Sequence, residues 1–146
     1  MQSPPLRRSL SSKRSRSLRR RSSACPGRVE EHLTGKGGGD TLDGRNGTDT
    51  ATYDTAITAS LTTGSASDGD TLIGIENLTG SAGADVLEGN GSNNILDGGS
   101  GIDYLDGQGG TDTCIGGLPV GRPLFEEPDP DTCTAACETA TGCTVL

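Results

Sequence analysis

Four nine-residue blocks follow one another without a gap: GSAGADVLE (80–88), GNGSNNILD (89–97), GGSGIDYLD (98–106) and GQGGTDTCI (107–115). Each block begins with glycine, and three of the four carry aspartate at the sixth position, where the second block has Asn94. Two similar blocks stand upstream, GKGGGDTLD (35–43) and GRNGTDTAT (44–52). A fixed nine-residue period with an apolar residue near its end predicts a repeated turn and strand, so these blocks decide the fold.

The blocks divide into a turn and a short strand. Their glycines allow positive φ at little cost, which favours a tight turn with accessible carbonyl groups. The last three residues form a minimal strand whose middle side chain points inward. These inward residues are Leu42, Ala51, Leu87, Leu96, Leu105 and Cys114. One block is then half a coil, so turns on the same edge recur every 18 residues in an all-β solenoid.

The 18-residue spacing brings sixth-position side chains together in pairs. It stacks Asp85 with Asp103 on one edge, and Asn94 with Asp112 on the other. Two carboxylates and several carbonyls make an all-oxygen cage. Such a cage favours calcium, which takes 6–8 oxygens at roughly 2.3–2.6 Å, over magnesium, which requires a stricter octahedron. The alternative is a flexible Gly/Asp-rich linker without metal, and the constant register of the blocks argues against it.

The unit is close to G-G-x-G-x-D-x-U-x, with U apolar, and the chain resembles the RTX, or haemolysin-type, calcium-binding repeat proteins. The resemblance implies a right-handed parallel β-roll in which one turn supplies carbonyls from its first and third residues and the next from its second and fourth. Asn94 keeps an oxygen but lacks the charge, so its site should be the weaker one. The implied ligands are Gly80, Ala82, Asp85, Gly99, Gly101 and Asp103 in one site and Gly89, Gly91, Asn94, Gln108, Gly110 and Asp112 in the other, with Asp40 and Asp49 as further metal ligands.

Composition indicates a chain that needs a ligand to fold. Hydrophobic residues make up 29% of the 146 residues, with three aromatics and 24 glycines, so the core is thin and the entropy cost is high. Residues 37–146 hold two Arg and 18 Asp/Glu, a formal charge of −16, which calcium would offset. Extracellular calcium modules have dissociation constants of about 10⁻⁴–10⁻³ M, so we expect an extracellular protein, secreted or at the cell surface.

The chain divides into three parts. Residues 1–34 are predicted to be a disordered Arg/Ser-rich tail, since residues 1–36 hold ten Lys/Arg and two Glu, a formal charge of +8. This segment has no apolar run that would make a signal peptide. It is interpreted as an arm for nucleic acid or an anionic surface, a solvated tail, or a start assigned too far upstream. Its lack of aromatics disfavours nucleic acid as a partner.

Residues 35–116 are predicted to form the β-roll, with an imperfect-repeat insert at 53–79. In the insert, ITASL (57–61) alternates in the manner of a strand. Asp49 and Asp85 are 36 residues apart, which equals two full coils and predicts that the roll continues in register through the insert. Asp68 and Asp70 are interpreted either as a further, non-repeat ligand set or as a solvated turn.

Residues 117–146 lose the repeat and are predicted to be an irregular Pro/Cys-rich cap or tail. Cys133, Cys137 and Cys143 have a spacing that is unusual for zinc, and His32 is distant in sequence. Disulfides fit an extracellular protein better. Four cysteines from Cys114 onward allow three pairings, with Cys25 left over. We predict a disulfide from Cys114 to Cys133, Cys137 or Cys143 that holds the tail over the end of the roll.

Functionally, the sequence favours a calcium-binding structural or secretion-associated module. No nucleophile, base and orienting group occur in a pattern typical of catalysis, so the prediction is a protein that is not an enzyme and has no small-molecule substrate. No run of 18 apolar residues predicts a transmembrane segment. The expected partners are calcium ions and a cell-surface or secretion-system component.

Overall fold

A computed structural model of the chain describes residues 30–117, 132–134, 137, 139–141 and 144–145. The described residues form strands and turns and contain no helix, which confirms the all-β prediction. The expectations for residues 1–29 and for the proline-rich stretch within 118–131 concern segments outside the described residues. The strands are β1 His32–Thr34, β2 Thr41–Asp43, β3 Thr50–Thr52, β4 Thr58–Ser60, β5 Ser65–Ala66, β6 Thr71–Ile73, β7 Asn77–Thr79, β8 Val86–Asn90, β9 Ile95–Asp97, β10 Tyr104–Gln108, β11 Thr113–Ile115, β12 Thr132–Cys133, β13 Thr139–Thr141 and β14 Thr144–Val145.

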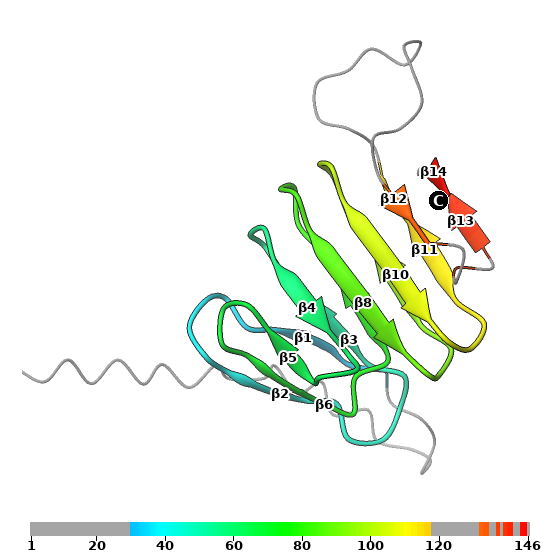
Figure 1. The fold of residues 1–146 in the computed structure, drawn as a ribbon. Helices are drawn as coiled ribbons and strands as arrows, with labels where there is room; N and C mark the ends of the chain where they lie inside the picture. Colours follow the sequence, from blue (N-terminus) through cyan, green and yellow to red (C-terminus); the bar gives the residue numbers. More distant parts are fainter. Residues whose placement is uncertain (1–29, 118–131, 135–136, 138, 142–143, 146) are drawn as a thin grey trace, which may run out of the picture.

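The strands make two sheets (Figure 1). One has six strands in the order β1-β3-β7-β9-β11-β13, and all its pairings are parallel. The other has eight strands in the order β14-β12-β10-β8-β4-β5-β6-β2 and is mixed, because β5 pairs antiparallel with both β4 and β6. The chain passes from the six-stranded to the eight-stranded sheet and back, and we call one such passage a circuit.

Most circuits in the repeat region have the length that the sequence predicts. Val86 pairs with Tyr104, and Ile95 pairs with Thr113, which are offsets of 18 residues in both sheets. Because each strand has its middle residue turned inward, the predicted inward side chains are all buried. Leu78, Leu96 and Cys114 therefore lie side by side in one sheet and Leu87 and Leu105 in the other.

The insert breaks this regularity. From Thr50 in β3 to its partner Asn77 in β7 the offset is 27 residues, because β4 turns back through β5 to β6 before the chain returns. We call β4–β6 the meander. The prediction of two full coils between Asp49 and Asp85 is therefore wrong: Asp49 precedes a strand of the six-stranded sheet and Asp85 one of the eight-stranded sheet, one and a half circuits later.

The predicted boundaries of the repeat region also need correction. Residues 32–34 were assigned to the disordered tail, but they form β1, pair with β3 and bury Leu33, an apolar residue at the middle of a three-residue strand. Beyond residue 116, β12–β14 extend both sheets, so the described part of the C-terminal segment is not irregular. Backbone pairing with β10 and β11 makes these strands possible without a nonapeptide sequence.

A disulfide fastens the C-terminal strands to the repeats. Cys114 in β11 is bonded to Cys137, which is one of the three partners predicted for it. Cys133 is also disulfide-bonded, so Cys133 and Cys137 have no free thiolate for zinc, in agreement with the preference for disulfides. The covalent link joins the last nonapeptide block to the segment just before β13, which lies next to β11 (Figure 1).

Candidate metal centre in the stacked turns

Six of the residues that directly precede a strand are buried polar side chains at an edge of the sheets. Asp49, Asp70, Asp85, Asn94, Asp103 and Asp112 are all at most 2% exposed. In most of them a carboxylate oxygen accepts a hydrogen bond from the backbone N–H of the equivalent residue one circuit earlier. Burial of this many carboxylates is costly unless each finds partners. The turns therefore concentrate negative charge at positions that the fold keeps out of water.

The first predicted site lies where turn 80–85 stacks on turn 98–103. The Asp85 N–H donates to Asp103 Oδ1 at 2.8 Å, and the Ser100 N–H donates to the Ser81 carbonyl at 2.9 Å. Asp85 Oδ2 accepts from the Ser81 N–H at 2.7 Å. The two aspartates predicted to share an ion are thus neighbours, and the turns that hold the predicted carbonyl ligands face each other.

Glycine is required in these turns by close approach. A Cβ on Gly80 would lie 2.6 Å from both Asp85 Oδ2 and the Gly98 carbonyl oxygen. Gly99 and Gly101 have φ of 88° and 139°, in the left-handed region, as the repeat pattern predicts. At the first position of the block, oxygen atoms therefore approach the backbone so closely that any residue larger than glycine would collide with them.

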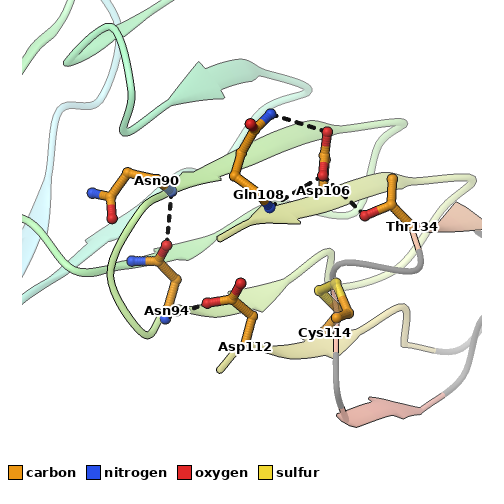
Figure 2. Close-up of a disulfide and its surroundings, with 8 residues drawn as sticks. Asn90, Asn94, Asp106, Gln108, Asp112, Cys114 and Thr134 are labelled. Carbon is orange, nitrogen blue, oxygen red and sulfur yellow. Dashed lines mark hydrogen bonds between the residues drawn. A yellow bond between two sulfur atoms is a disulfide. The ribbon is translucent and has the colours of Figure 1, made fainter. Parts of the chain in front are cut away.

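The second predicted site lies where turn 89–94 stacks on turn 107–112 (Figure 2). The Asn94 N–H donates to Asp112 Oδ1 at 2.7 Å, and Asn94 Oδ1 accepts from the Asn90 N–H at 2.8 Å. The Asn94 side-chain amide also donates to the Glu76 carbonyl at 2.7 Å. Asn94 thus uses its nitrogen to bind a backbone oxygen that a carboxylate would repel.

Asp40 and Asp49, the remaining predicted ligands, have partners that the nonapeptide pattern does not supply. The Asp40 N–H donates to Asp70 Oδ1 at 2.6 Å, and the Asp49 N–H donates to Glu76 Oε2 at 2.8 Å. Asp70 is 1% exposed, so its interpretation as part of a solvated turn is wrong. Glu76 is not among the predicted ligands, although its place just before the three-residue strand Asn77–Thr79 with buried Leu78 marks it as a sixth-position residue.

Asp49 and Asp70 differ from the other buried carboxylates in how their second oxygen is placed. Within the described residues, Asp49 Oδ2 and Asp70 Oδ2 have no hydrogen-bond partner. Burial raises the pKa of Asp70, as do the carboxylates of Asp68 and Asp40, and the hydrogen bond from the Asp40 N–H opposes them. A buried polar group left without a partner costs about 1–3 kcal/mol. A cation at each oxygen would remove that cost.

The chemistry of the donors fits calcium. The described side chains contain no group of three His, Cys, Asp or Glu that would form a cage by themselves. A site here must then combine a pair of carboxylates with carbonyl oxygens of the turns. Oxygen-only coordination with many neutral donors is what calcium takes. The oxygen atoms that converge on Gly80 beside Asp85, and the oxygens of Asp49 and Asp70 that lack a partner among the described residues, point to the same ion.

Comparison with protein families agrees with this geometry. The RTX calcium-binding nonapeptide repeat matches the chain in four copies, over residues 30–54, 67–105 and 92–118, which together span just over half of it. The chain belongs to the RTX calcium-binding repeat family. No curated protein matched it. Because these repeats bind Ca²⁺, calcium is the cofactor of this RTX protein.

Family membership also gives a general context. RTX repeats are typically structural rather than catalytic, and the proteins that carry them are generally secreted or extracellular. Among the described residues of this RTX chain, no helix has the length and apolar character needed to cross a membrane. These properties describe the class of protein to which the stacked turns belong.

Proposed function

We propose that this RTX chain is an extracellular module, structural or associated with secretion, whose strands wind into a right-handed parallel β-roll when calcium binds. The observation that carries the proposal is the stacking of Asp85 on Asp103, in turns whose oxygen atoms converge on Gly80 at distances that exclude any side chain. The proposed ligands are Asp40, Asp49, Gly80, Ala82, Asp85, Gly89, Gly91, Asn94, Gly99, Gly101, Asp103, Gln108, Gly110 and Asp112.

Calcium-dependent folding is supported by the balance of forces in the repeats. The core consists mostly of small and medium side chains, so burial alone contributes little to the free energy of folding. Against it stand the backbone entropy of 24 glycines and a ladder of buried carboxylates. An ion bound only to the folded state shifts this balance by mass action.

The location follows from the size of that shift. At a calcium concentration tenfold above the dissociation constant, each site adds about 1.4 kcal/mol to folding. With dissociation constants of about 10⁻⁴–10⁻³ M, this gain arises only where calcium is millimolar. The same chain gains almost nothing at submicromolar calcium. We therefore place its folded state outside the cell, with no catalytic role and with calcium as its ligand.

Circular dichroism in the far ultraviolet tests the proposal. The full chain in chelator should give a coil-like spectrum, and titration with calcium to about 10 mM should raise the β signal. Magnesium at the same concentration should have much less effect, which controls for simple charge screening. A spectrum that calcium leaves unchanged would refute calcium-dependent folding.

A further inference from the structure

The inward rows of leucines end in cysteines where the nonapeptide sequence stops. In the six-stranded sheet Leu96 is paired with Cys114, and in the eight-stranded sheet Leu105 is paired with Cys133. Both cysteines are fully buried, and both are disulfide-bonded. In each sheet a half-cystine therefore occupies the inward position that leucine holds in the preceding strands.

The strands beyond the repeats are short, with two residues in β12, three in β13 and two in β14. Backbone pairing joins β12 to β10 and β13 to β11. Thr134 extends the first of these contacts: its N–H donates to the Leu105 carbonyl at 3.0 Å, and its hydroxyl donates to Asp106 Oδ1 at 2.9 Å (Figure 2). Because strands this short bury little apolar surface, we expect them to separate from the roll unless another bond holds them.

The Cys114–Cys137 disulfide supplies that bond. It joins residues 23 positions apart whose Cα atoms are separated by 5.8 Å, and Cys137 lies just before β13, the neighbour of β11. The Cys137 N–H donates to the Thr134 carbonyl at 3.1 Å, which connects the half-cystine to the end of β12. A disulfide limits the conformations of the unfolded chain and so favours the folded one. Reduction should therefore loosen β12–β14 more than the rest of the roll.

The strand that carries Cys114 also follows a residue of the second predicted calcium site. Asp112 directly precedes β11, and its Oδ1 accepts the Asn94 N–H at 2.7 Å (Figure 2). In the closed structure β11 lies between β9 and β13. Without β13 it would become an edge strand, which opens more easily than a strand paired on both sides. The order of the turn that holds Asp112 thus depends on the disulfide.

We infer that the Cys114–Cys137 disulfide is a redox switch that sets the calcium affinity of the roll. When the disulfide is closed, β11 is held between two strands and Asp112 is in place for the ion. When it is open, calcium binds only the fraction of molecules in which β11 is ordered, so the apparent affinity falls by that fraction. This inference rests on the proposed calcium-binding function.

Closing the switch needs an oxidant, and a small-molecule disulfide such as oxidised glutathione is sufficient. The sulfur–sulfur bond forms between Cys114 and Cys137, the bond in glutathione disulfide breaks, and two electrons and two protons pass to the two glutathione thiols that leave. The coupling must also act in reverse, because calcium binding and oxidation are equilibria of one chain. If the closed disulfide raises calcium affinity by a given factor, saturating calcium favours the closed disulfide by the same factor.

Equilibration of the full chain with mixtures of reduced and oxidised glutathione tests the inference on the unaltered protein. One series contains about 10 mM calcium, a second contains chelator, and a third contains magnesium as the control for charge screening. Alkylation followed by peptide mapping gives the fraction of chains with the Cys114–Cys137 bond. Calcium should shift this equilibrium toward the disulfide by roughly fivefold or more, and magnesium should shift it much less. An equilibrium that calcium leaves unchanged overturns the inference.

Cys137→Ala gives a second measurement, in which Cys114 stays as a buried thiol. In calorimetric titration this variant should bind calcium more weakly than oxidised wild type, by the same factor of roughly five or more. Cys25→Ala, which leaves the Cys114–Cys137 bond in place, should bind calcium as wild type does. Equal affinities for Cys137→Ala and oxidised wild type overturn the inference. Wild type that binds no calcium in either redox state would instead refute the proposed function.

Discussion

The regular blocks 80–115 and the meander reach the same edge geometry by different routes. In the regular blocks, Asp85 and Asp103 meet because the sequence repeats every 18 residues. At the meander, Asp40 and Asp70 meet 30 residues apart because β2 pairs with β6 and not with β4, the next strand of the same sheet along the chain. Strand pairing, and not sequence spacing, therefore determines which carboxylates face each other. Substitutions at equivalent positions can therefore measure how far the two regions are alike.

The largest loss of stability should come from truncating a leucine of the apolar core. The loss should be larger in the regular blocks than in the meander. Leu96 is fully buried between Leu78 and Cys114 in neighbouring strands, so Leu96→Ala should lower the free energy of unfolding by about 2–5 kcal/mol. Leu72 in the meander has Leu42 on one side, whereas β5 on the other side is short and antiparallel. Leu72→Ala should therefore cost less.

Urea denaturation in saturating calcium measures both losses. The comparison depends on the difference between the two variants, because each removes the same atoms. Equal losses for Leu96→Ala and Leu72→Ala would show that the meander is packed as firmly as the regular blocks.

The next effect concerns the paired carboxylates. Asp85→Ala and Asp103→Ala should each remove the same ion, and each should lower stability in calcium by about 1.4 kcal/mol when calcium is tenfold above the dissociation constant. The double variant should cost little more than either single one, because the shared ion is lost only once. Denaturation with and without calcium provides the double-mutant cycle. Additive losses would contradict a site shared by two stacked turns.

The regular blocks were predicted well from the sequence because their glycine, sixth-position and apolar residues all repeat with the same nine-residue period. The period placed Leu87, Leu96 and Leu105 inside and stacked Asp85 with Asp103, and the structure has both features. The same reasoning failed at 53–79, since a two-residue strand such as β5 has no periodicity of its own. Its pairing with β4 and β6 is determined by tertiary contacts and not by a local sequence pattern. The 36 residues from Asp49 to Asp85 therefore suggested two coils, whereas the chain makes one and a half circuits.

Asn94 is a smaller exception within the regular blocks, and the structure changes what its replacement should do. From the sequence, Asn94→Asp should strengthen the site by adding a charge. However, the Asn94 amide donates to the Glu76 carbonyl at 2.7 Å, and a carboxylate would lose that bond. We therefore expect Asn94→Asp to lower stability by about 1–2 kcal/mol in chelator and to tighten calcium binding.

Calcium titrations at several urea concentrations separate the two effects of Asn94→Asp. Without calcium, the variant should be less stable than wild type. Because the variant should gain more stability from calcium, the two curves of unfolding free energy against calcium concentration should cross. A variant that is weaker at every calcium concentration would show that the amide has a structural role that a charge does not replace. Asp54→Asn, an exposed exchange of the same two side-chain types, is the control.

The smallest effect concerns the second position of the blocks, where Lys36, Arg45 and Gln108 adopt left-handed backbone conformations. Lys36, beside the meander's partner strand, has φ of 62°, and Gln108 in the regular blocks has φ of 69°. A left-handed conformation costs an L-residue about 1–2 kcal/mol, while glycine raises the entropy of the unfolded chain by roughly half that amount. Lys36→Gly should therefore raise the free energy of unfolding by about 0.5 kcal/mol.

Gln108→Gly should gain less than Lys36→Gly, because the Gln108 side chain has a role that the lysine lacks. Its amide donates to Glu88 at 2.8 Å and to Asp106 at 3.1 Å, and these two carboxylates lie directly opposite each other in β8 and β10. Removing the amide leaves two like charges facing each other without a bridge, which offsets the relief of strain. Thermal unfolding of both variants in calcium measures the difference, and a larger gain at Gln108 than at Lys36 would show that the bridge contributes nothing.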